Sequence, residues 1–170
     1  RVLEEAVQHL LKAVRPVIIA GGGANHSQAH GEIQALSEIL AAPVVTTISG
    51  QGIMPDDHPL ALGVVGDNGF HPYANQAVEE ADLLLYIGCK RGSVSTIRWT
   101  LPSYNPTRRI IQIDLDPRLG GELEGLQRVG DGRGEPAALL APGQAAMDLA
   151  RFLHRGALLP GREVPVVARV

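Results

Sequence analysis

Residues 15–23 have the sequence Arg-Pro-Val-Ile-Ile-Ala-Gly-Gly-Gly, a short apolar run of mostly β-branched side chains that ends in three glycines. Because no polar residue alternates with the apolar ones, the run is typical of a strand buried on both faces of a parallel sheet. Pro16 separates it from the preceding segment, and the glycines allow a tight turn at its carboxyl end. The stretch therefore predicts an α/β fold.

The segments on both sides repeat this cycle of strand, turn and helix. Apolar spacings of three and four predict an amphipathic helix over residues 2–14, with an apolar face of Val2, Leu3, Ala6, Val7, Leu10, Leu11 and Val14. A second helix is expected over residues 28–40, capped by Asn25 or Ser27. Further strands are predicted at 43–47, 62–65, 82–87, 109–114 and, as a short edge strand, 127–129. Further helices are predicted at 72–80 and 145–153.

Together these elements predict a three-layer Rossmann-like domain with a six-stranded parallel sheet flanked by helices. In such a sheet the ligand crevice lies at the carboxyl ends of the strands. Glycines gather there, because predicted strands are followed by Gly21 to Gly23, Gly50, Gly66 and Gly88. Without a Cβ they let backbone amides approach a ligand, and amides at a helix N-terminus favour anions. A tight turn with no ligand is the alternative for the three consecutive glycines.

The composition fits one soluble domain and argues against several classes of protein. With 170 residues, 45% of them hydrophobic and 19% charged, the chain is long enough for one hydrophobic core. A formal net charge of -3 without a Lys/Arg cluster argues against nucleic-acid binding. The one cysteine, Cys89, rules out an intramolecular disulfide and a multi-cysteine zinc site, and it suits a cytoplasmic location. No apolar run approaches the roughly 18 residues of a membrane span, so no membrane partner is expected.

Two side chains near the predicted crevice are candidates for chemistry. Cys89 follows a glycine that ends a strand, where a nucleophile can sit, although a small packed side chain is the alternative. Asp114 lies just past a strand, where a carboxylate can accept hydrogen bonds from ribose hydroxyls. The alternative is a turn that Asp114, Asp116 and Pro117 stabilise.

Neither a dinucleotide fingerprint nor a metal site is predicted. His26 stands where G-x-G-x-x-G needs its third glycine, and the second strand ends in Thr46-Thr47 rather than in a ribose-binding acid. His26 and His30 are four residues apart, but Ser27 occupies the glutamate position of H-E-x-x-H and no third ligand is evident. Catalytic and metal-binding residues are therefore not expected in this chain.

Five segments follow one another in a specific order and spacing: residues 15–23, 42–52, 57–60, 80–88 and 111–117. As a set they resemble the middle domain of thiamine-diphosphate-dependent enzymes of the acetolactate synthase and pyruvate oxidase type, over roughly residues 1–131. The resemblance implies a central domain at residues 1–155, and a linker at 156–170 toward a missing catalytic domain. The start at Arg1 rather than Met fits such a fragment.

The implied parent enzyme decarboxylates or cleaves a 2-oxo acid and transfers an acyl-anion equivalent, using thiamine diphosphate and Mg²⁺ held by flanking domains. This chain alone is expected to be inactive, and its partners are those domains and further copies of the parent in a dimer or tetramer. Gly130-Asp131-Gly132 resembles the start of the magnesium motif, which also needs an Asn roughly 25–30 residues later. Because no Asn occurs after Asn105, Asp131 is not expected to bind metal.

In flavin-containing relatives this domain binds FAD along the carboxyl edge of its sheet, so the resemblance implies a site for FAD or another adenine nucleotide. The implied cofactor-binding residues are Gly21, Gly22, Gly23, Thr47, Ile48, Val65, Gly66, Gly88, Cys89, Asp114, Leu115 and Asp131. Residues 88–92 are Gly-Cys-Lys-Arg-Gly where acetolactate synthases usually have Gly-Ala-Arg-Phe-Asp. Lysine cannot reproduce the planar fork of arginine. The rival interpretation is a freestanding FAD- or NAD(P)-binding module of the electron-transfer flavoprotein or transhydrogenase type.

Overall fold

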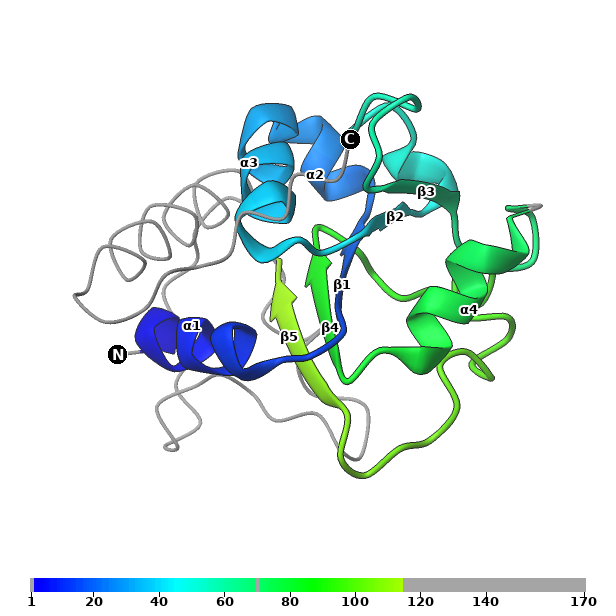
Figure 1. Ribbon diagram of the computed structural model, residues 1–170. Helices are drawn as coiled ribbons and strands as arrows, with labels where there is room; N and C mark the ends of the chain where they lie inside the picture. The colour runs from blue at the N-terminus through cyan, green and yellow to red at the C-terminus, as the bar shows by residue number, and fades with distance from the viewer. Residues whose placement is uncertain (1, 70, 115–170) are drawn as a thin grey trace.

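The computed structural model describes residues 2–69 and 71–114, which form a parallel sheet with helices on both faces (Figure 1). Its strand order is β3-β2-β1-β4-β5. The strands are β1 (Pro16–Ala20), β2 (Val44–Thr46), β3 (Ala61–Val64), β4 (Leu83–Ile87) and β5 (Arg109–Ile113). The helices are α1 (Val2–Lys12), α2 (Gly22–His26), α3 (His30–Leu40) and α4 (Pro72–Glu80), with a 3₁₀ turn η1 (Ile48–Gly50). None of these helices is long and apolar enough to cross a membrane.

The expected α/β class and the parallel sheet are confirmed, but the described part of the chain holds five strands rather than six. The expected edge strand at 127–129 and the helix at 145–153 lie outside the described residues. The chain order reverses beside β1, which pairs in parallel with β2 on one side and with β4 on the other. A reversal of this kind opens a crevice at the carboxyl ends of the two strands.

Each face of the sheet packs into its own hydrophobic core. Ile18 of β1 and Leu85 of β4 pack with buried side chains of α1 and α3, including Leu10 and Ile33. The intervening strand residues face the other side, where they pack against α4 in a second core that contains Val17, Ile19, Leu84, Tyr86, Ala74 and Val78. Because both faces are covered, the strand sequence is apolar without alternation.

The first helix is shorter than its apolar pattern predicts. It ends at Lys12, and the side chains of Leu11 and Val14 are 37% and 84% exposed rather than on the buried face. Asp82 explains the early end, because its carboxylate accepts the backbone N–H groups of Val14 at 2.7 Å and Arg15 at 2.9 Å. These bonds direct the chain into β1 instead of a further helical turn.

The helix expected over residues 28–40 is also different in the structure. A short helix, α2, begins at Gly22 directly after β1, and Gln28 interrupts the helical path with a φ of 54°. α3 then begins at His30 without a side-chain cap, so the predicted capping by Asn25 or Ser27 is wrong. Asn25 instead donates its amide to the carbonyls of Ser49 at 3.1 Å and Gln51 at 2.7 Å, which ties α2 to the turn after β2.

Candidate functional site

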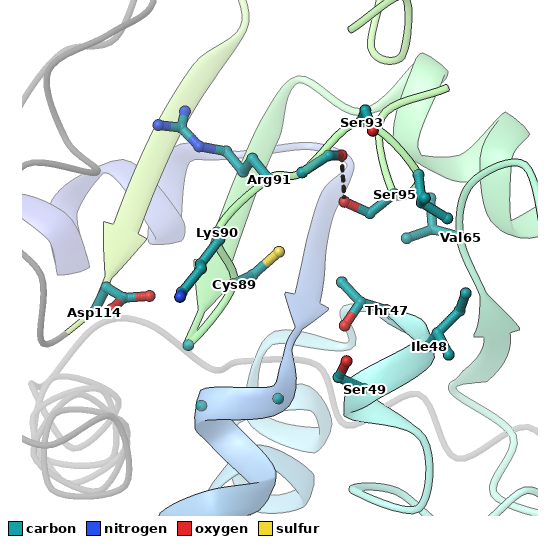
Figure 2. A pocket seen from close by; sticks show the side chains of 15 residues that line it. Thr47, Ile48, Ser49, Val65, Cys89, Lys90, Arg91, Ser93, Ser95 and Asp114 are labelled. Atoms are coloured by element: carbon teal, nitrogen blue, oxygen red, sulfur yellow. Dashed lines mark hydrogen bonds between the residues drawn. The ribbon is translucent and has the colours of Figure 1, made fainter. Parts of the chain in front are cut away.

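A pocket of about 710 Å³ lies at the carboxyl ends of the strands, at the edge where the sequence predicts a crevice (Figure 2). Every strand contributes a following loop to its wall. The lining residues are Gly22 and Gly23 after β1, Thr47, Ile48 and Ser49 after β2, Val65 after β3, the segment 88–95 after β4, and Asp114 after β5. The volume is within the range of pockets that hold small-molecule ligands.

The structure brings together eight of the twelve residues expected to bind a cofactor. They are Gly22, Gly23, Thr47, Ile48, Val65, Gly88, Cys89 and Asp114. Gly21 and Gly66 do not line the pocket, because each packs against backbone in the wall: a Cβ at Gly21 would lie 2.3 Å from the Gly88 oxygen, and one at Gly66 2.2 Å from the Val94 oxygen. Leu115 and Asp131 lie outside the described residues. That the eight residues bind a cofactor stays a prediction.

The amides of the glycine loop after β1 were expected to contact a ligand, but in the structure two of them bond to carbonyls of the protein. The Gly21 amide donates to the Ile87 carbonyl, and the Gly23 amide donates to the Gly88 carbonyl, each at 2.9 Å. These amides are therefore used within the protein, where they hold the loop after β1 against the loop after β4. The glycines permit the close approach of two backbone segments that together form the floor of the pocket.

Sequence reasoning missed the larger part of one wall. Ser49 and the segment 90–95 line the pocket, although the expected site included nothing in the β4 loop beyond Cys89. The sequence could have indicated this segment, because it directly follows the strand-ending Gly88, and loops in that position border the carboxyl edge of the sheet. Hydrogen bonds fix this segment: Asp67 donates its N–H to the Val94 carbonyl at 3.1 Å, and Ser95 Oγ donates to the Gly92 carbonyl at 3.0 Å.

Cys89 lies in the wall as a packed side chain. It is 2% exposed, and burial raises the pKa of its thiol, although a hydrogen bond from the Arg91 backbone acts in the opposite direction. A raised pKa keeps the thiol protonated at neutral pH, whereas nucleophilic cysteines have lowered pKa values. The geometry therefore supports the packing interpretation of Cys89.

Charged side chains are few around the pocket. Asp114 is half-buried at one end, and Lys90 and Arg91 are the cations among the described residues of the wall. Ile48 and Val94, which are 46% and 42% exposed, give it an apolar part. Within residues 2–69 and 71–114, no group of three or more His, Cys, Asp or Glu side chains is placed to hold a metal ion. The arrangement is suited to binding a ligand with both polar and apolar parts.

Comparison with known proteins agrees with this architecture. A family model described as "Thiamine pyrophosphate enzyme, central domain" matches residues 3–130. The chain belongs to this family. The central domain is 41% identical over 117 residues to a probable acetolactate synthase large subunit of Methanococcus aeolicus, covering 69% of this chain and 19% of the relative. The corresponding protein of Methanocaldococcus jannaschii is 44% identical over 117 residues, covering 68% of the chain and 19% of the relative.

A third relative has a different printed activity. Glyoxylate carboligase of Escherichia coli O157:H7 is 36% identical to the central domain over 115 residues, covering 68% of this chain and 19% of that enzyme. The chain thus spans about a fifth of the length of these curated relatives. These matches confirm the resemblance to the acetolactate synthase type, and they give no support to a freestanding flavin or nicotinamide module.

Proposed function

We propose that this central domain is the scaffold of a thiamine-diphosphate-dependent enzyme that decarboxylates a 2-oxo acid and transfers an acyl-anion equivalent. The names of the relatives, acetolactate synthase and glyoxylate carboligase, support this reaction class. The domain contributes architecture and a ligand pocket rather than proton-transfer groups. We also propose that the parent protein is a cytoplasmic homo-oligomer with the domain boundary near residue 155.

Thiamine diphosphate and its magnesium ion do not fit the described part of this domain. The ion needs several oxygen ligands, and no cluster of His, Cys, Asp or Glu side chains capable of holding a metal occurs among residues 2–69 and 71–114. When bound, thiamine diphosphate supplies the electron sink that makes decarboxylation of a 2-oxo acid possible. We assign the binding of thiamine diphosphate to the flanking domains. The role that we propose for this chain is to hold those domains apart at a fixed geometry.

The pocket at the carboxyl edge is proposed to hold an adenine nucleotide of the FAD or ADP class. Its position where the loops of all five strands meet is the observation that carries this proposal. Asp114 supplies a carboxylate for ribose hydroxyls, and the hydroxyls of Thr47 and Ser49 lie on the opposite wall (Figure 2). The apolar surface of Ile48 and Val94 suits the flat ring at the other end of such a ligand.

Calorimetric titration of the chain with FAD, ADP and NAD tests the nucleotide proposal. We expect FAD and ADP to bind, and Asp114→Asn to weaken ADP binding roughly tenfold, because a hydrogen bond to a charged acceptor is replaced by a weaker one. Asp57→Asn removes the same charge from an exposed position outside the pocket and should leave the affinity unchanged. Equal binding by both variants would refute the role of Asp114, and tight binding of NAD alone would favour the rival module.

The parent activity needs a separate experiment on the full reading frame. We expect it to encode thiamine-binding domains on both sides of this domain. The purified full-length protein should release CO₂ from a 2-oxo acid such as pyruvate or glyoxylate when given thiamine diphosphate and Mg²⁺, and the 170-residue chain should not. A reading frame without such domains, or turnover by the chain alone, would show that the scaffold proposal is wrong.

A further inference from the structure

Two adjacent cations in the loop after β4 point in different directions. Arg91 is only 8% exposed, and its guanidinium lies over the ring of Tyr86, 5.6 Å from the ring centroid. Figure 2 shows this guanidinium turned away from the pocket, whereas the ammonium of Lys90 projects into the pocket on the side of Asp114. Lys90 is exposed, and its side chain makes no hydrogen bond or ion pair with another described residue.

The neighbours of Lys90 explain its direction. On one side, Cys89 is buried, and its carbonyl accepts a hydrogen bond from Gln112 Nε2 of β5 at 2.9 Å. On the other side, Arg91 has a φ of 51°, a conformation that costs free energy in a non-glycine residue and persists where surrounding contacts hold it. Stacking on Tyr86 supplies such a contact. With both neighbours fixed on the sheet, Lys90 is the residue left facing the pocket.

The consequence is that only one cation of the described lining presents its charge to a ligand. Phosphate groups are bound by lysine as a point charge, and an ammonium that pairs with no described residue is available for that contact. We infer that Lys90 binds the phosphate of the pocket ligand, a phosphate or diphosphate ester, and that Arg91 is a positioning residue that holds the turn. This inference rests on the proposed nucleotide site and assigns the charge recognition within it.

The chain offers a matched control, because it contains two lysines, Lys90 and Lys12, and Lys12 is exposed at the end of α1 outside the pocket. In calorimetric titrations with ADP and with inorganic diphosphate, we expect Lys90→Met to lower both affinities roughly tenfold or more. Lys12→Met changes the net charge equally and should leave both affinities within twofold of the wild type. Lys90→Arg keeps the charge and should retain most of the affinity.

Salt dependence separates the two roles. Screening weakens a direct ion pair, so the wild-type affinity for ADP should fall as the ionic strength rises. Lys90→Met should show a flatter dependence, because the ion pair is already lost. Arg91→Met should weaken binding yet keep the wild-type salt dependence, a result that loss of a direct phosphate contact would not give.

The possible outcomes distinguish this inference from the proposed function. Wild-type affinity for ADP and diphosphate in Lys90→Met, or a flattened salt dependence in Arg91→Met, would overturn the assignment while leaving the nucleotide site intact. Lys90-dependent binding of diphosphate without binding of ADP or FAD would uphold the assignment and refute the nucleotide class. A wild-type chain that binds none of the three ligands would overturn both.

Discussion

Gly88→Ala is expected to lower the free energy of unfolding by about 2–5 kcal/mol, measured by urea denaturation. Gly88 has a φ of 57°, and a left-handed conformation costs a residue with a Cβ about 1–2 kcal/mol. The new Cβ would also lie 2.3 Å from the Ala24 nitrogen and 2.6 Å from the Gly23 carbonyl carbon. Both are backbone atoms of α2, which cannot rotate away as a side chain can, so overpacking adds about 1–3 kcal/mol.

Gly92→Ala is the matched control for that substitution. Gly92 is in the same loop, and a Cβ there would meet no atom of the described residues within 4 Å other than those of its own chain neighbours. We expect its effect to stay within about 0.5 kcal/mol, as for other surface substitutions. Equal destabilisation by the two variants would mean that the close contact between the loops after β1 and β4 does not determine stability.

Arg108→Met is expected to lower the free energy of unfolding by about 3–5 kcal/mol, because it leaves one buried carbonyl, that of Ala81, and two partly buried carbonyls without their donors. Arg108 is 7% exposed and donates from Nε to the Ala81 carbonyl at 3.0 Å, from Nη1 to the Ser103 carbonyl at 2.6 Å, and from Nη2 to the Glu79 carbonyl. Its guanidinium therefore joins the end of α4 to the loop before β5, at the residue that directly precedes this strand.

Two further variants test this explanation in the same denaturation experiment. Arg108→Lys keeps the charge but not the planar fork, so it should recover less than half of the loss. Arg98→Met removes an arginine whose side chain is 85% exposed and should change stability by no more than about 0.5 kcal/mol. A lysine variant as stable as the wild type would show that charge, rather than the three directed hydrogen bonds, is what matters at Arg108.

The fold could be predicted where burial alone decides the local structure. β1 was expected at residues 17–20 and occupies Pro16–Ala20, because a strand covered on both faces must be apolar throughout. The division of the second helix at Gln28 could not be predicted in this way. It depends on the bonds from Asn25 to the turn after β2, a contact between segments that are distant in sequence.

The candidate site, like the fold, could be predicted only in part from the sequence. The edge of the sheet followed from strand order and strand-ending glycines, so eight expected residues meet at one pocket. The opposite directions of Lys90 and Arg91 did not follow, because they depend on Tyr86 in β4 and Gln112 in β5. The local sequence shows that both side chains are cations. Only the tertiary contacts determine that Lys90, and not Arg91, directs its charge into the pocket.

The Asn25 amide has a consequence for how the pocket receives a ligand. By bonding two carbonyls of the turn after β2, it makes the loops after β1 and β2 a single preorganised wall. A ligand that contacts this wall loses little affinity to the ordering of loops, a cost that often offsets favourable contacts. We therefore expect Asn25 to favour the proposed binding from outside the pocket, by lowering the entropic cost of association rather than by contacting the ligand.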